Sequence, residues 1–239
     1  MHDLGKIVYL DNFKTGSSLI TDFINKCSSL KIKYFSKHKL ISNDFRNDTF
    51  YFTTVRDPFD TYVSRFRYGC DGKDGIFLRM RAAGFADLYK PTNEAFHEWL
   101  EFVFDPANAK QMNDGYPLVA KLGIGLNSYL HLIFSIRHTS ARLVNIKSAS
   151  EFDEIYEKEK IVSLVMKNEN LNDELRHFAT VRFPEYFDQE LVELYFSRNK
   201  RVNASESGNV SEFTFTPQLR EKILEREHFL ISRFYPELL

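Results

Sequence analysis

The sequence has little of what marks disulfide-rich, membrane-spanning or nucleic-acid-coating proteins. Its two cysteines, Cys27 and Cys70, exclude a disulfide framework and a cysteine-based zinc module. No stretch approaches the ~20 apolar residues of a membrane-spanning helix. The 32 Lys and Arg against 33 Asp and Glu give a net charge of -1, which lacks the basic excess of a general nucleic-acid binder. Without an apolar export segment near residue 1, we expect a cytoplasmic protein.

The composition is that of a folded protein with an aromatic core. Hydrophobic residues make up 43% and charged residues 27% of the chain, which excludes wholesale disorder. The 23 Phe and 12 Tyr supply large side chains for the core. We find no internal repeat or low-complexity segment, and the polar stretch 199–211 is too short for a clear domain linker. The sequence therefore predicts one domain over residues 1–239.

A strand–turn–helix pattern occurs twice near the start of the sequence. Residues 7–10 (IVYL) predict a buried strand, and apolar residues three or four apart predict a helix from Ser17. Residues 50–55 (FYFTTV) predict another strand, after which Asp57 is the N-cap and Pro58 the first residue of a helix. This layout predicts an α/β fold with a mostly parallel sheet.

The rest of the chain is predicted to be mainly helical. Cys27 lies on the apolar face of the first helix, so we expect it in the core. Further helices are predicted over 94–104, 127–134 and 169–178, and from Pro217 with Thr216 as its cap. Further strands are predicted over 31–35, 142–146 and 161–166.

The first turn carries residues suited to bind an anion: Lys14, Thr15, Gly16, Ser17 and Ser18. Glycine allows a tight turn, and the free N–H groups of the following helix point toward the loop. The hydroxyls add donors and the lysine adds a positive charge. The Walker A pattern is absent, because the lysine precedes the glycine. The alternative is an ordinary strand-to-helix turn with a serine cap.

The second turn carries Arg56 at the predicted carboxyl end of a strand, where ligands bind in open α/β sheets. Ser64 follows two helical turns later, and an arginine fork and a hydroxyl can share one phosphate. The alternative is that Arg56 pairs with Asp57 or caps a helix, and that Ser64 faces solvent.

Together, KTGSS and RDPFDTYVS resemble the two cofactor-binding motifs of sulfotransferases that use 3'-phosphoadenosine 5'-phosphosulfate (PAPS). The resemblance is closest to carbohydrate sulfotransferases of the heparan sulfate 2-O and 6-O type. It implies a P-loop-like three-layer fold, with a central mostly parallel sheet flanked by helices. It also implies that residues 14–18 bind the 5'-phosphosulfate, and that Arg56 and Ser64 bind the 3'-phosphate. Phe13 departs from the proline that is common in the family.

A third segment, residues 200–205 (KRVNAS), also resembles this family. Its residues Arg201, Asn203 and Ser205 match the late loop that closes over the 3'-phosphate in these enzymes. The alternative is a solvated loop. The segment 164–178 resembles the strand and helix that precede this loop. Between residues 73 and 156, where acceptor recognition would lie, the resemblance is loose.

Transfer to a hydroxyl needs a base, and histidine suits this role near neutral pH. Of the seven histidines, His38 alone matches the family in position, after the 31–35 strand and before the Arg56 strand. Its neighbours Lys37 and Lys39 are expected to lower its pKa and keep it neutral. Asp11 and Glu98 are rival carboxylates. The second histidine of an H-E-x-x-H metal site is missing, so we expect no metal.

The resemblance thus implies a sulfotransferase that moves a sulfuryl group from PAPS to a carbohydrate hydroxyl and releases 3'-phosphoadenosine 5'-phosphate (PAP). His38 and Lys14 are the expected catalytic residues. A P-loop nucleotide kinase or other phosphotransferase, or a non-catalytic nucleotide-binding module of the same fold, is the alternative. The acceptor is expected to be a glycan or another hydroxyl compound and not a nucleic acid. The acceptor's identity and the oligomeric state stay open.

Overall fold

The computed structural model of the chain describes residues 1–137, 142–197 and 213–239. These residues group into two compact units whose segments alternate along the sequence. Unit 1 comprises 1–56, 134–137 and 161–197. Unit 2 comprises 57–133, 142–160 and 213–239. That the whole chain forms one domain stays a prediction.

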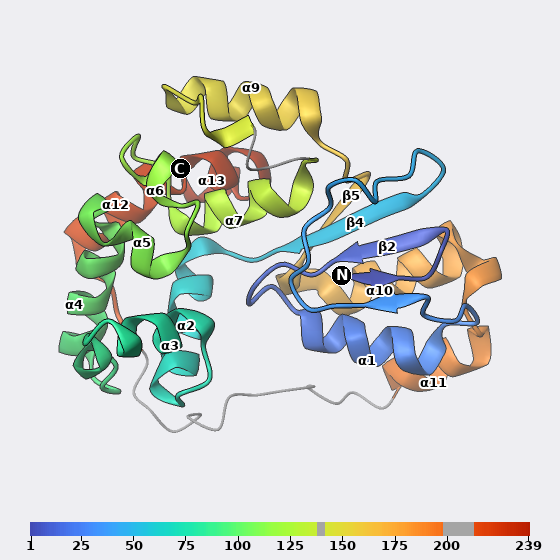
Figure 1. Cartoon of the computed structure of the whole chain (residues 1–239). Coiled ribbons are helices and arrows are strands. Elements are labelled where there is room, and N and C mark those ends of the chain that lie inside the picture. The colour runs from blue at the N-terminus through green and yellow to red at the C-terminus, as the bar shows by residue number, and fades with distance from the viewer. Residues whose placement is uncertain (138–141, 198–212) are drawn as a thin grey trace. The chain divides into compact units, whose positions relative to one another are not determined.

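Unit 1 is built on a mixed sheet, seen in Figure 1. Within the described ranges it has the order β3-β1-β2-β4-β5. The longer strands β2, β4 and β5 are parallel neighbours, whereas the two-residue strands β1 and β3 pair antiparallel at one edge. The predicted α/β fold with a mostly parallel sheet is confirmed. The strands are β1 (His2–Asp3), β2 (Ile7–Leu10), β3 (Tyr34–Phe35), β4 (Phe50–Val55) and β5 (Leu164–Lys167).

Alternating side chains of β2 fill the two faces of this sheet. Ile7 and Tyr9 belong to the larger core cluster, and Val8 and Leu10 belong to a smaller cluster on the other face. Apolar residues from three helices also belong to the larger cluster. One of them is Cys27, which is 1% exposed, so its predicted place in the core is confirmed. These helices are α1 (Ser17–Cys27), α10 (Leu171–His177) and α11 (Gln189–Ser197). The 3-10 turn Asn168–Asn170 lies between β5 and α10. The π-helical segment Phe178–Arg182 and the 3-10 turn Pro184–Tyr186 lie between α10 and α11.

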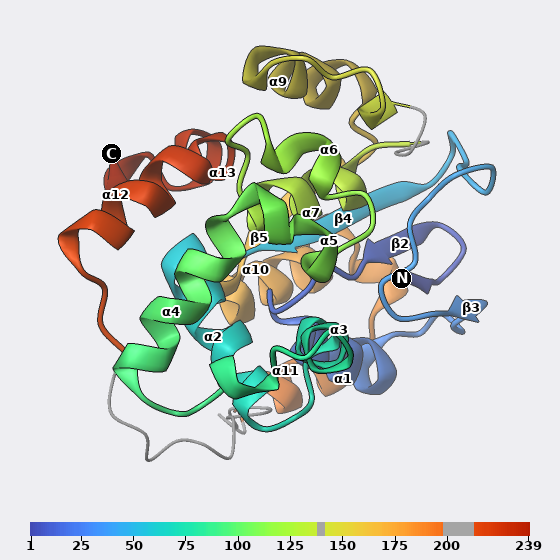
Figure 2. The same cartoon turned by 60° about the vertical axis from the view of Figure 1, so that its left-hand side comes forward.

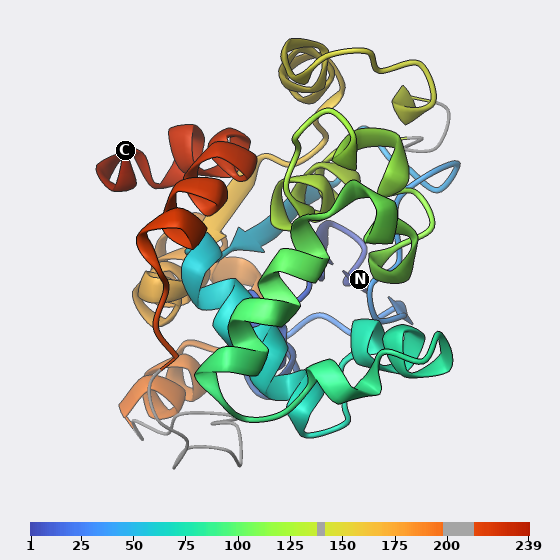
Figure 3. The ribbon, with the colours of Figure 1, turned by 90° about the vertical axis from the view of Figure 1, so that its left-hand side faces the viewer.

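Unit 2 is helical in the part that the structure describes, and Figures 2 and 3 show α4 lying against α2. Asp57 caps α2 as predicted, because its carboxylate accepts the Phe59 N–H at 2.7 Å. The helices are α2 (Pro58–Cys70), α3 (Gly75–Ala82), α4 (Asn93–Phe104), α5 (Ala109–Met112), α6 (Pro117–Ala120), α9 (Ala149–Glu159), α12 (Pro217–Arg226) and α13 (His228–Phe234). Short 3-10 turns span Ala86–Leu88, Pro106–Asn108 and Pro236–Leu238. Helix α7 (Leu126–Ser135) begins in unit 2, and its last two residues belong to unit 1.

Most predicted elements are confirmed, including the α12 cap, where Thr216 accepts the Leu219 N–H. The strand predicted over 142–146 is wrong, because these residues form a helical end and a turn. The buried residues there, Leu143 and Ile146, are three apart, and Val144 between them is 62% exposed. This is helical spacing, which a short apolar run does not distinguish from a strand.

Two further strands are shorter or displaced. The strand predicted over 31–35 is reduced to β3, because its partner β1 has only two residues. The strand predicted over 161–166 begins later, as β5, because Ile161 instead donates its N–H to the Ser135 carbonyl. Among the described residues, no helix is long and apolar enough to cross a membrane.

Candidate active site

The turn between β2 and α1, in unit 1, holds the first predicted constellation. Two of its residues have left-handed backbone conformations, with φ at 61° for Lys14 and 102° for Gly16. Gly16 is the N-cap of α1, and it makes no side-chain bond to the first N–H groups of the helix. Those groups have no partner within the helix and lie at the positive end of its dipole. The turn is therefore suited to hold an anion on backbone N–H groups.

A chain of hydroxyl groups fixes this turn to β4. Thr15, which is 4% exposed, donates from Oγ1 to the Asn12 carbonyl at 3.2 Å and lies 2.6 Å from Thr54 Oγ1. Thr54 Oγ1 in turn lies 3.1 Å from the Tyr9 hydroxyl. Since each hydroxyl donates once, the protons run from Tyr9 through Thr54 and Thr15 to the carbonyl. The Thr15 hydroxyl thus holds the turn in place.

Gly16 is also approached closely by the segment after β5. A Cβ atom at this position would lie 2.6 Å from Asn168 Nδ2 and closer still to Leu171 Cδ2. The turn therefore requires glycine for space as well as for its backbone angle. Asn168 is a residue that sequence reasoning missed. Its position in the sequence was a usable signal, because Asn168 directly follows β5, a strand parallel to β4. The carboxyl ends of parallel strands lie on the same side of a sheet, which is also where the anion turn follows β2.

His38 lies beside the same turn in unit 1. Its ring stacks on Phe13, the residue before Lys14, with ring centroids 3.7 Å apart and an interplanar angle of 18°. Its Nδ1 lies 3.0 Å from the backbone carbonyl of Asp11 and 3.7 Å from Asp11 Oδ1. The Phe134 ring meets it edge-on at 6.4 Å. The structure thus brings the predicted base next to the predicted anion turn, from which it is distant in sequence.

The pKa of His38 is lowered from its ordinary value of 6.5, as predicted, but mainly for another reason. Burial is the largest cause, Asp11 acts in the opposite direction, and Lys37 adds a smaller lowering. Lys39, the other predicted cause, does not contribute to this lowering, and its ammonium group pairs with Asp44 at 2.7 Å. The ring is therefore neutral near pH 7, as a general base must be.

The second constellation is divided between the two units. Arg56 directly follows β4 in unit 1 and is half-buried. Ser64 lies two turns into α2 in unit 2 and is also half-buried. Their joint binding of a 3'-phosphate stays a prediction. The predicted residues of the third segment, Arg201, Asn203 and Ser205, lie outside the described residues.

Three of the other candidate bases and ligands, His97, His131 and Glu98, belong to unit 2. His97 donates from Nε2 to the Thr214 carbonyl at 2.8 Å. His131 is fully buried, and burial lowers its pKa to about 3. The rival carboxylate Glu98 is exposed on α4, whereas Asp11 is buried against His38. Within the ranges described, no group of three or more His, Cys, Asp and Glu side chains could hold a metal ion.

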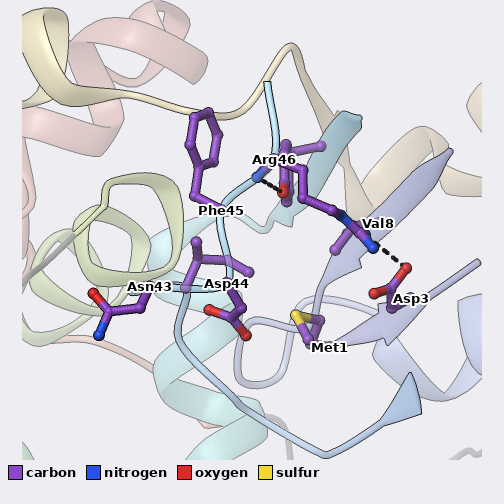
Figure 4. A pocket seen from close by; sticks show the side chains of 9 residues that line it. Met1, Asp3, Val8, Asn43, Asp44, Phe45 and Arg46 are labelled. Carbon is purple, nitrogen blue, oxygen red and sulfur yellow. Dashed lines mark hydrogen bonds and ion pairs between the residues drawn. The ribbon is translucent and has the colours of Figure 1, made fainter. Parts of the chain in front are cut away.

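A pocket of about 290 Å³ opens in unit 1, and Figure 4 shows its lining. Arg46 lines this pocket, and its Nη2 donates a hydrogen bond to Asp3 Oδ1 at 2.8 Å. Its backbone N–H donates to the Tyr51 hydroxyl at 2.9 Å. None of the predicted site residues that the structure describes lines this pocket. Its lining consists of Met1, Asp3, Val8, Ile41, Asn43, Asp44, Phe45, Arg46 and Tyr51.

A model of a family described as the sulfotransferase family matches residues 5–226. The match includes the anion turn, His38, Arg56 and Ser64. Neither a search of curated proteins nor a search of solved structures finds a match.

Proposed function

The chain belongs to the sulfotransferase family, and on this premise we propose that it transfers a sulfuryl group from PAPS to a carbohydrate hydroxyl. The observation that carries the proposal is the stacking of His38 on Phe13, directly before Lys14. A candidate base and a candidate phosphosulfate turn thereby meet in one unit. A charge-neutral ring beside an anion site is what proton removal from an acceptor requires.

The anion turn has features that fit a phosphosulfate group. Gly16 leaves the first N–H groups of α1 without a side-chain cap, and the hydroxyl chain from Tyr9 to Thr15 fixes the turn before any ligand arrives. PAPS, when bound, supplies the sulfuryl group that is transferred. The N–H groups and hydroxyls of Ser17 and Ser18 would hold its 5'-phosphosulfate. Arg56 and Ser64, together with Arg201, Asn203 and Ser205, would hold its 3'-phosphate.

The protein's own residues then divide the chemistry between them. His38 takes the proton of the acceptor hydroxyl and makes the oxygen a better nucleophile. The Lys14 ammonium group neutralises the negative charge that develops on the leaving phosphate oxygen.

The strand–turn–helix anion site on a mostly parallel sheet also supports a P-loop-like fold whose sheet is flanked by helices. The carbohydrate acceptor rests on the resemblance of RDPFDTYVS to the heparan sulfate 2-O and 6-O enzymes.

Two measurements test the proposal. In a thermal shift experiment, PAP without metal should raise the melting temperature more than ATP with Mg²⁺ does, because binding to the native state stabilises it. Labelled PAPS should then transfer its sulfuryl group to at least one member of a panel of glycans. The variant Lys14→Ala is the control, since it should bind PAP but transfer about 10²–10³ times more slowly. Stabilisation by ATP with Mg²⁺ alone would indicate a kinase, and stabilisation by neither ligand a non-catalytic module.

A further inference from the structure

Asp11 carries a buried carboxylate that the proposed function does not yet use. It is the first residue after β2, and its side chain is 1% exposed. In the part of the chain that the structure describes, Asp11 Oδ1 has no hydrogen-bond partner. Burying a charge without compensation is costly, so such a group is retained only where something offsets the cost.

The imidazole of His38 lies within ion-pair distance of this oxygen, and the amino group of Met1 also interacts with the Asp11 carboxylate. The distance from Oδ1 to His38 Nδ1 is 3.7 Å, within the range of an ion pair once the ring is protonated. The same Nδ1 lies 3.0 Å from the Asp11 backbone carbonyl. A carbonyl oxygen can only accept a hydrogen bond, so Nδ1 carries the proton of the neutral ring. Nε2 then holds the lone pair and is the atom able to remove a proton.

We propose that Asp11 is a positioning residue for His38, fixing its tautomer through the backbone carbonyl and stabilising its protonated form through the carboxylate. This inference rests on the proposed function, in which His38 is the base. In the transfer step the acceptor O–H bond breaks and its proton forms an N–H bond at Nε2. The electron pair left on the acceptor oxygen forms the new O–S bond. The S–O bond to the 5'-phosphate breaks at the same time, and PAP leaves with the electron pair of that broken bond. The new imidazolium charge then faces the Asp11 carboxylate.

The other groups around the ring explain why such a carboxylate is needed. The Lys37 ammonium group and the amino group of Met1 both oppose a positive charge on His38, as burial does. Phe13 stacks on one face of the ring and Phe134 meets it edge-on. Both side chains are uncharged, so neither can balance a positive charge on His38. Asp11 acts against these influences. The ring can thus be neutral before the reaction and still accept a proton during it.

The variant Asp11→Asn tests this directly, because it removes the charge and keeps both the backbone carbonyl and the side-chain size. The pKa of His38, followed by NMR titration of its ring without substrates, should fall by about 1. The acid limb of kcat/KM should move by the same amount, and kcat at pH 7 should fall by about tenfold or more, with PAP affinity within about threefold of wild type. Asp44→Asn is the matched control: its carboxylate pairs with Lys39, so the His38 titration should not move.

The outcomes separate this inference from the proposed function. An unchanged His38 pKa in Asp11→Asn overturns the inference, whether or not the wild-type protein transfers sulfuryl groups. A lowered pKa with an unmoved acid limb overturns the assignment of His38 as base and, with it, the role of Asp11 in the reaction. If Asp11→Asn folds poorly, a second measurement on the wild-type protein tests the same inference. Its Asp11 carboxyl ¹³C resonance should shift at the pH where His38 titrates, and a resonance that stays constant there also overturns the inference.

Discussion

Gly16 is the residue at which a single methyl group should do most damage to the anion turn. Its φ of 102° is left-handed, a conformation that costs a residue with a Cβ about 1–2 kcal/mol. The added atom would also press on Leu171, a core residue that is 3% exposed, and on Asn168 Nδ2 at 2.6 Å. Overpacking of this kind costs about 1–3 kcal/mol. Gly16→Ala should therefore lower the free energy of unfolding by about 2–5 kcal/mol.

Gly5→Ala is the matched control in the same unit. Gly5 has a similar φ of 92°, but a Cβ there would meet only the far end of the Lys33 side chain, which is exposed and can move. It should lose about 1–2 kcal/mol, the backbone cost alone. Urea unfolding followed by far-ultraviolet circular dichroism measures both variants.

Calorimetry with PAP then separates the turn from general stability. Gly16→Ala should bind PAP at least about tenfold more weakly, because moving the turn displaces the N–H groups that hold the anion. Gly5→Ala should bind it normally. If Gly16→Ala is no less stable than Gly5→Ala, the close packing of the segment after β5 on the turn is refuted. If it binds PAP as wild type does, the turn is not the phosphate site.

Three further predictions concern the site and the fold. Arg56→Ala should weaken PAP binding by about 2–4 kcal/mol, but should barely change binding of adenosine 5'-phosphosulfate, which lacks the 3'-phosphate; equal losses for both ligands would show a different role. His38→Ala should lower kcat by about 10²–10⁴ at nearly unchanged PAP affinity. Because burial lowers the pKa of His38, wild-type kcat/KM should fall only as the pH drops below 6.5, and a variant that keeps this acid limb excludes His38 as the base. Glu227→Gln should lower the free energy of unfolding by about 1–3 kcal/mol. The buried carboxylate accepts hydrogen bonds from Tyr62 Oη, from the Asn127 N–H, and from the N–H and Oγ of Ser128, and an amide NH₂ would face some of these donors. Urea unfolding that matches wild type would contradict this.

Local signals were enough to predict the elements around the site. The strands β2 and β4 and the helices α1 and α2 follow from apolar runs, from helical spacing, and from Asp57 with Pro58 at a helix start. These signals depend on a few neighbouring residues, so the elements can be predicted without knowing the rest of the fold. They failed at 142–146, where a short apolar run is compatible with either periodicity.

The chemistry of the turn was readable in part. Lysine, glycine and two serines between a strand and a helix indicated an anion site, with an ordinary strand-to-helix turn as the alternative. Their composition did not reveal that the Thr15 hydroxyl is committed to Thr54, because that bond joins residues far apart in sequence. The same limit applied to the pKa of His38, which was attributed to neighbouring lysines and is in fact lowered chiefly by burial.

The sequence by itself thus predicted which residues bind an anion and, through the family resemblance, which histidine acts as a base. Only the tertiary structure decided that they meet. His38 stacks on Phe13, Asp11 is buried against its Nδ1, and Asn168 approaches Gly16 because parallel strands bring separate loops to one edge of the sheet. Such contacts depend on strand order and on the path by which the chain returns to the sheet, and neither property is encoded within a short window of sequence.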